Sequence, residues 1–165
     1  MQNVTVEEAF EAAIGAEKAA EEFFSGLKAK FSHDPDVSQL WLQYAEDEAM
    51  HAKWLEALKA KLGPDEISAF VDGHTVQLLE AVARISVEKA LASVHDLEEA
   101  YELVNEIESG ETNAIFRFLM DNFETDEKMR DFLRTQLNMH VARLTIDLPQ
   151  QYRGAAARRK IKASA

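Results

Sequence analysis

The sequence predicts an all-α protein built as a bundle of four long helices, and three observations lead to this prediction. Ala, Glu, Leu and Lys dominate the composition, with only six Gly and three Pro between them, and such a composition favours helices. Apolar residues recur three and four positions apart along most of the chain. Capping and helix-breaking residues divide this pattern into four long segments and one connecting region.

The first two long helices have clear boundaries. Thr5 and Glu8 form a Thr-x-x-Glu capping box, which predicts a helix from Thr5 to about residue 31. The stretch "SHDPD" ends it, because Pro35 disfavours a helical conformation in the residue before it. A second helix is expected from Pro35 to Leu62, where "LGP" supplies a Gly cap followed by Pro.

A long crossover, residues 63–95, separates these helices from the last two. It contains the short segment "PDEISAFVDG" and a stretch at 74–92 with helical periodicity, so we expect it to be partly helical. Asp96 and Glu99 then predict the start of a third long helix that continues to about residue 123. The fourth is expected over residues 125–148, before Pro149.

The two halves of the chain resemble each other. The first helix of each half has a cap, an aromatic residue at the same place (Phe10 and Tyr101) and a Glu seven residues later (Glu17 and Glu108). Each also closes with Leu-x-x-x-Phe. Two hairpins joined by one long connection have the connectivity of a ferritin-like four-helix bundle. We therefore predict a ferritin-like four-helix bundle with one long, partly helical crossover between the second and third long helices.

Composition and charge exclude several classes of protein. A chain of 165 residues with 47% hydrophobic and 29% charged residues is long and apolar enough to form one folded domain, expected over residues 1–148. There is no Cys, which excludes disulfides, Fe–S clusters and thiol catalysis and fits a reducing compartment such as the cytoplasm. The first residues lack the pattern of a signal peptide, and no stretch is long and apolar enough for a membrane span.

The charge is distributed unevenly. The net charge is -12, which argues against nucleic acid as a partner of the main domain. Residues 149–165 hold five of the 18 basic residues and none of the 30 acidic ones, so the rest of the chain has a formal charge of -17. We expect this basic segment to be a solvated, flexible C-terminal tail, with docking to an acidic partner as the alternative.

Polar residues interrupt the apolar stripe of every long helix near its middle. The stripe of the first helix is apolar except at Glu17. The other interruptions, in chain order, are Glu48 and His51, then Glu108 and Glu111, then His140 with Arg143 at the edge of the stripe. Buried carboxylates at one level of a bundle repel one another and are costly to desolvate.

A cation at this level would relieve both penalties. Carboxylates and neutral imidazoles suit Fe(II), Mn(II) or Zn(II), and the Glu-x-x-His of Glu48 and His51 places both side chains on one face of a helix. The sequence therefore predicts a metal site formed by Glu17, Glu48, His51, Glu108, Glu111 and His140. The alternative is a buried polar layer without metal, in which Arg143 neutralises the carboxylates directly.

Three segments carry a resemblance to a known family: "AIGAEKAAEEFF", "LWLQYAEDEAMHAKWLEAL" and "IESGE". Over residues 5–148 the chain resembles the rubrerythrin branch of the ferritin-like superfamily. The resemblance implies a di-iron carboxylate centre, with Glu17, Glu48, His51, Glu108 and Glu111 at ligand positions. It also implies reduction of peroxide or dioxygen, a separate electron-donor protein and a homodimer.

Two features depart from the pattern of that family. In the fourth helix His140 stands where a Glu is expected, and Arg143 stands where the second ligand is expected. The Cys-rich rubredoxin module that usually delivers electrons is not present in this chain, which has no Cys.

The sequence leaves three functions open. The first is a di-iron oxidoreductase or ferroxidase that receives electrons from another protein. The second is a metal-binding or structural protein with a degenerate, non-catalytic site that holds one metal. The third is an interaction module, in which the amphipathic segment at 74–92 pairs with another subunit instead of packing on its own bundle.

Overall fold

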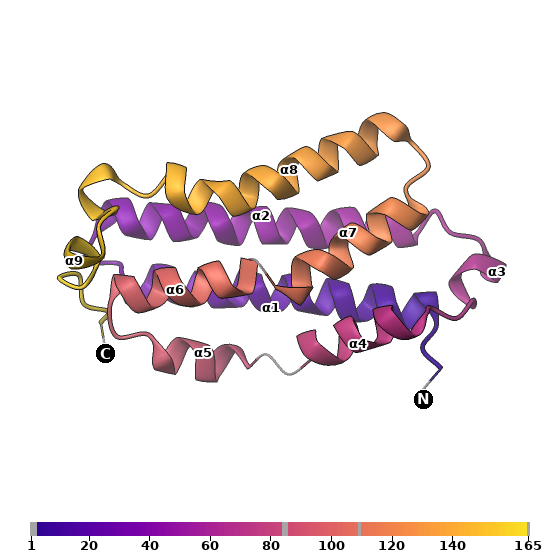
Figure 1. The fold of residues 1–165 in the computed structure, drawn as a ribbon, viewed down its shortest axis with the longest axis horizontal. Coiled ribbons are helices and arrows are strands. Elements are labelled where there is room, and N and C mark those ends of the chain that lie inside the picture. The colour runs from indigo at the N-terminus through magenta and orange to yellow at the C-terminus, as the bar shows by residue number, and fades with distance from the viewer. Residues whose placement is uncertain (1–2, 84–85, 109, 165) are drawn as a thin grey trace.

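The computed structural model describes residues 3–83, 86–108 and 110–164, and of Val82, Glu111 and Thr112 it describes the backbone only. Four long helical segments form the bundle: α1 (Val6–Lys30), α2 (Pro35–Lys59), the pair α6 (Leu97–Glu108) and α7 (Glu111–Phe123), and α8 (Glu127–Ile146). Figure 1 shows α6 and α7 running one after the other, and α7 contacts α1 while α8 contacts both α6 and α7. This is the predicted ferritin-like, all-α architecture.

The predicted capping residues form the helix starts. The Thr5 side chain accepts a hydrogen bond from the Glu8 backbone N–H, and the Glu8 carboxylate accepts one from the Thr5 N–H, which completes the capping box of α1. Asp34 caps α2, with Pro35 in its first turn. The helices α1 and α2 pack closely against each other as a hairpin.

The crossover contains three short helices: α3 (Pro64–Ile67), α4 (Gly73–Val82) and α5 (Val87–Ser93). The helices α4 and α5 lie along α1, and α4 also contacts α7 (Figure 1). Gly26 allows α5 to approach α1 closely, because a Cβ at this position would lie 2.4 Å from a methyl carbon of Leu91. The crossover thus covers the outer face of α1 in its own chain.

The third long helix is interrupted, which differs from the single helix expected over residues 96–123. The helix α6 ends at Glu108 and α7 begins at Glu111, with Gly110 in an extended conformation (φ -96°, ψ -158°) as the N-cap of α7. Gly has a low helix propensity because its backbone loses the most conformational freedom in a helix. The interruption falls at the level of the predicted metal ligands.

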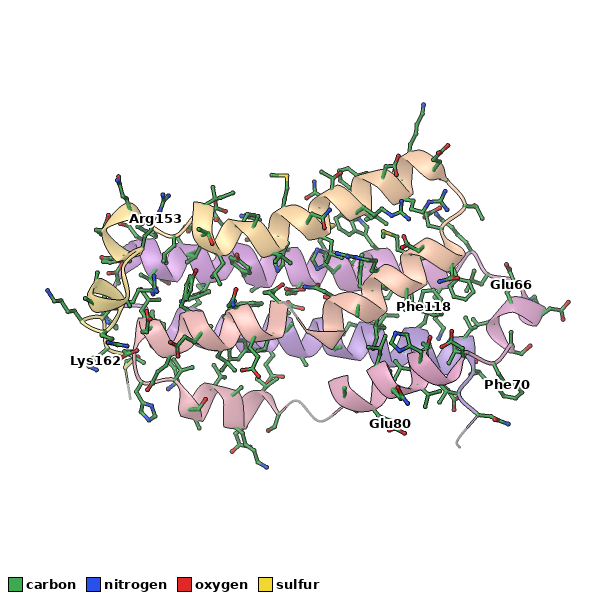
Figure 2. The ribbon with its side chains drawn as sticks, viewed as in Figure 1. Glu66, Phe70, Glu80, Phe118, Arg153 and Lys162 are labelled. Atoms are coloured by element: carbon green, nitrogen blue, oxygen red, sulfur yellow. The ribbon has the colours of Figure 1, made fainter. Side chains whose placement is uncertain are left out.

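The C-terminal segment also differs from the flexible tail that the sequence led us to expect. It forms the 3-10 helix η1 (Gln150–Tyr152) and the short helix α9 (Ala155–Arg158), and it folds against one end of the bundle. The Leu97 N–H donates to the Ile161 carbonyl, and the Ser164 N–H donates to the Lys30 carbonyl. Figure 2 shows Arg153 and Lys162 of this segment at the end of the molecule opposite Glu66 and Phe70.

Candidate metal centre

The predicted polar residues lie in one buried layer between two apolar clusters. One cluster is built around Phe10, Leu55 and Phe116. The other is built around Phe24 and Trp41, toward the opposite end of the bundle. The layer between them contains side chains that are each at least 95% buried: Glu17, Glu48, His51, Glu108 and His140. Five of the six predicted ligands are therefore together inside the bundle.

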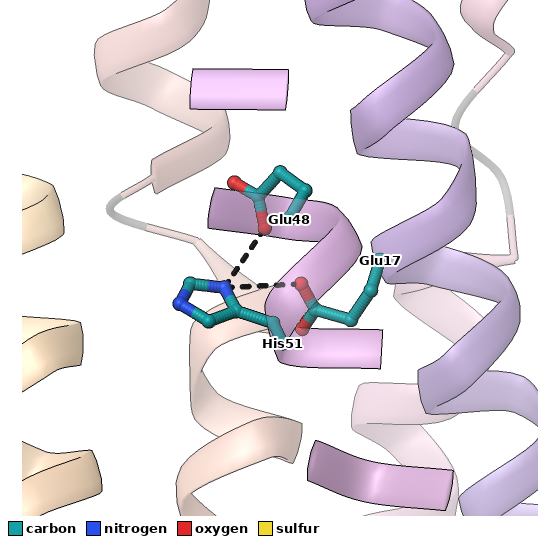
Figure 3. Close-up of side chains that lie close together, drawn as sticks. All are labelled: Glu17, Glu48 and His51. Atoms are coloured by element: carbon teal, nitrogen blue, oxygen red, sulfur yellow. Dashed lines mark hydrogen bonds and ion pairs between the residues drawn. The ribbon is translucent and has the colours of Figure 1, made fainter. Parts of the chain in front are cut away.

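The first group of candidate ligands joins α1 to α2. His51 Nδ1 lies 2.9 Å from Glu48 Oε2 and 3.5 Å from Glu17 Oε2, as Figure 3 shows. The helical spacing of three places Glu48 and His51 on one face of α2, opposite Glu17 on α1. One ligand atom from each of the three residues lies within 4.8 Å of the others, which is close enough for all three to bind one cation.

The second group shares Glu48 with the first. Its members are Glu48, Glu108 and His140, again with ligand atoms within 4.8 Å of one another. His140 Nε2 lies 2.9 Å from Glu48 Oε1 and 3.2 Å from Glu108 Oε1. The two oxygens of Glu48 therefore face different histidines, with Oε2 beside His51 and Oε1 beside His140.

Burial and close charges shift the pKa values of the layer. Desolvation raises the pKa of Glu17 well above its usual range. Desolvation also raises the pKa of Glu48, but the close His140 and His51 rings outweigh it and the net shift is downward. Burial lowers the pKa of each histidine, and the neighbouring carboxylates outweigh this, so that the pKa of His51 rises to about 9 and that of His140 to about 12.

Arg143 binds groups at the edge of the layer. Its guanidinium forms ion pairs with Asp47 and, at 2.5 Å from Nε, with Asp147, and it donates to Gln43. The Asp47 side chain is 35% exposed, and its carboxylate also lies 3.3 Å from His140 Nδ1. The ion pairs and the hydrogen bond described for Arg143 therefore do not support the alternative of a metal-free layer in which Arg143 neutralises the carboxylates directly.

Comparison with known proteins agrees with the fold and the residue pattern. The structure superimposes on a crystal structure from Thermotoga maritima, described as that of a ferritin-like diiron-carboxylate protein, with a TM-score of 0.63. The two chains are 17% identical, and the match covers 91% of this chain and 98% of the other. A search among curated proteins found no match. The sequence model of the rubrerythrin family matches residues 8–137.

This chain belongs to the rubrerythrin family. The matched region contains four of the five clustered residues, and only His140 lies beyond its end. The family membership confirms the resemblance that the sequence motifs indicated, and the clustered Glu and His side chains form a candidate metal site on a ferritin-like scaffold.

The donor set of this rubrerythrin-family chain fits divalent metal ions. Each group offers two carboxylates and one imidazole, which are suitable ligands for iron, manganese or zinc. His140 Nε2 supplies a further observation: the atom is buried and close to two carboxylates, yet it has no hydrogen bond of good geometry among the described residues. A buried ring nitrogen of this kind requires an explanation, and a metal between the carboxylates would provide one.

The break between α6 and α7 affects the two acidic residues of the third helix differently. Glu108 is buried, and Asn113 Nδ2 donates to both its backbone carbonyl and, at 3.2 Å, its carboxylate Oε2. The side chain of Glu111 lies outside the described part of the structure, so its predicted role as a ligand stays a prediction. Sequence reasoning missed Asn113, because its contact with Glu108 depends on the helix break.

A groove between α2 and α8 connects the candidate centre with the surface. It has a volume of about 490 Å³, and both His51 and His140 line it. Apolar side chains surround its entrance, among them Met50, Phe132 and Met139, which are each 44–53% exposed. None of the helices among the described residues is long and apolar enough to cross a membrane.

Proposed function

We propose that this chain is a di-iron oxidoreductase that acts on peroxide or dioxygen and receives electrons from a separate protein. Glu17, Glu48 and His51 would hold one metal, and Glu48, Glu108 and His140 would hold the other. The observation that carries the proposal is the position of Glu48, which faces both histidines and belongs to both groups of ligands. A carboxylate shared in this way suits a bridging ligand between two metals.

The residues around the centre support redox chemistry with a small oxidant. Glu17, Glu48, His51, Glu108 and His140 would hold the iron, which when bound would supply the two electrons needed to convert peroxide and two protons into two water molecules. Burial raises the pKa of Glu17 well above its usual range, so this carboxyl group takes up a proton more readily than an exposed one. The groove lined by His51 and His140 supports access for the oxidant, while the apolar clusters on both sides exclude bulk water.

Metal analysis of protein purified without chelators tests this function. We expect about two metal ions per chain in the wild type. Glu48→Gln should lose both, because Glu48 serves both groups, whereas Glu17→Gln and Glu108→Gln should each lose one. Glu22→Gln is the matched control, because Glu22 is an exposed acid on the same helix as Glu17 and should leave the metal content unchanged.

Reaction with peroxide separates the oxidoreductase from a degenerate metal-binding protein, the alternative function. Protein loaded with Fe(II) should consume about one peroxide for every two irons oxidised. Binding of a single metal, or two bound irons that peroxide does not oxidise, would favour the degenerate site. Failure to bind Fe(II), Mn(II) or Zn(II), with no thermal stabilisation by any of them, would overturn both functions.

A further inference from the structure

We propose that Asp47, held in place by Arg143, is a positioning residue that fixes the ring of His140 so that Nε2 becomes the ligand of the second metal. The role assumes the metal centre proposed above and adds two residues to it that the comparisons do not assign. Asp47 lies on α2 directly before Glu48, and Arg143 lies on α8 one turn after His140.

The contacts of His140 determine which ring nitrogen can bind a metal. Nδ1 lies 3.3 Å from Asp47 Oδ2. An ionised carboxylate only accepts hydrogen bonds, so Nδ1 must carry the hydrogen, and in a neutral imidazole the free electron pair is then on Nε2. Nε2 is the atom that lies between Glu48 and Glu108 without a well-aligned hydrogen bond. Asp47 thus selects the tautomer that suits a metal at this position.

The two histidines of the centre use opposite ring nitrogens. His51 directs Nδ1 toward Glu48 and Glu17 (Figure 3), as expected for a residue three positions after its partner on the same helix. His140 comes from the facing helix and directs Nε2 toward the carboxylates, while its Nδ1 faces Asp47. The two halves of the centre therefore differ, and only the half with His140 depends on Asp47.

Arg143 restricts the position of Asp47. The guanidinium contacts the Asp47 carboxylate, and it is itself held by Asp147 at 2.5 Å and Gln43 at 3.3 Å. Its carbon atom Cζ lies 5.9 Å from the centre of the Tyr44 ring, and the Tyr44 hydroxyl donates to the His140 backbone carbonyl. In this way α2 and α8 hold the imidazole from both sides. Arg143, which stands where the family pattern has a ligand, thus holds Asp47 in place.

Zinc titration of the metal-free protein tests this role, because it measures binding without any enzymatic reaction. The wild type should bind two Zn(II) ions. Asp47→Ala should weaken one of the two sites by about 10- to 100-fold and leave the other nearly unchanged. Asp47→Asn, which keeps an acceptor oxygen for His140, should recover part of the loss. Arg143→Gln should weaken the same single site to a smaller extent.

Matched controls separate positioning from a simple change in charge. Glu46→Ala removes an exposed acid that lines the same groove, and Arg134→Gln removes a surface Arg of α8 that pairs with Asp121. Both controls should leave the two zinc affinities unchanged. Nitrogen NMR of the zinc-loaded wild type should show that His140 has hydrogen on Nδ1 and zinc on Nε2, and that His51 has the opposite arrangement.

The outcomes distinguish this inference from the proposed function. If the wild type binds two zinc ions and Asp47→Ala has the same affinities as Glu46→Ala, the role of Asp47 is overturned while the metal centre stands. Zinc on Nδ1 of His140 would overturn the role as well. If the wild type binds no metal, both the metal centre and the positioning role fail.

Discussion

The charges of the individual residues in the buried layer have to balance one another inside the bundle. Three carboxylates and two imidazoles meet there, and the carboxylates raise the pKa of His51 to about 9 and that of His140 to about 12. In the absence of metal, protons on the two rings offset the carboxylates. Metal ions have to replace these protons, so metal binding and protonation compete at the same atoms.

This competition predicts how the stability of the metal-free protein depends on pH. The pKa of His51 is raised above that of the unfolded chain, so its contribution is fully present below about pH 6.5 and is lost as the pH rises through about 9. The contribution of His51 to the free energy of unfolding should fall by about 2–3 kcal/mol over this range, and His140, whose pKa rises to about 12, adds to the decline. Urea unfolding at several pH values measures the effect.

Two comparisons support the assignment to His51. His51→Gln should make the dependence between pH 6.5 and 9 shallower by about 2–3 kcal/mol and leave the share of His140, whereas His33→Gln, which removes an exposed histidine in the turn before α2, should retain the full dependence. Zinc should reverse the trend, because fewer protons compete for the ligands as the pH rises. An unchanged slope in His51→Gln would contradict the assignment.

The members of the layer could be predicted from the sequence because each interrupts an apolar stripe with a period of three and four residues. Asp47 and Asn113 could not be predicted in the same way. Asp47 lies beside the stripe, and its link to Arg143 joins residues 96 positions apart in the chain. Asn113 reaches Glu108 across a helix break. Positioning residues of this kind follow from how helices meet, which periodicity does not determine.

At the scale of secondary-structure elements, the interruption separates α6 from α7, which run at an angle to each other (Figure 1). The apolar spacing continues across Gly110, so periodicity alone predicted one helix, and the low helix propensity of Gly was the available signal. Asn113 compensates for the break by donating to the backbone carbonyl and the carboxylate of Glu108.

Asn113→Ala tests this function of the break. Without the amide, the Glu108 carboxylate loses its 3.2 Å hydrogen bond, so the site formed by Glu48, Glu108 and His140 should bind zinc about 10-fold more weakly. The free energy of unfolding should fall by about 1 kcal/mol. Asn122→Ala is the matched control, because Asn122 donates to the Phe118 carbonyl within α7 and contacts no candidate ligand. Equal zinc affinities in the two variants would refute the coupling.

At the scale of the whole molecule, the C-terminal segment closes the end of the bundle farthest from the N-terminus (Figure 1). Its basic composition led us to expect a solvated tail. The sequence does not reveal that Arg158 has a buried acidic partner 60 positions away. Arg158 and Glu98 form an ion pair and are 8% and 7% exposed. The Arg158 guanidinium also lies over the Tyr101 ring, 4.1 Å from its centre.

Arg158→Ala should therefore destabilise the whole bundle. The substitution leaves the Glu98 carboxylate buried without its partner, and breaking a buried pair in this way costs about 3–5 kcal/mol. Arg159→Ala removes the neighbouring exposed Arg and should change the free energy of unfolding by less than about 0.5 kcal/mol. Urea unfolding of both variants measures the difference. Because the pair lies at the start of α6 and the candidate ligands lie in the middle of the bundle, zinc stoichiometry should be the same in both folded variants. A loss of stability in Arg158→Ala no greater than that in Arg159→Ala would show that the segment does not stabilise the bundle.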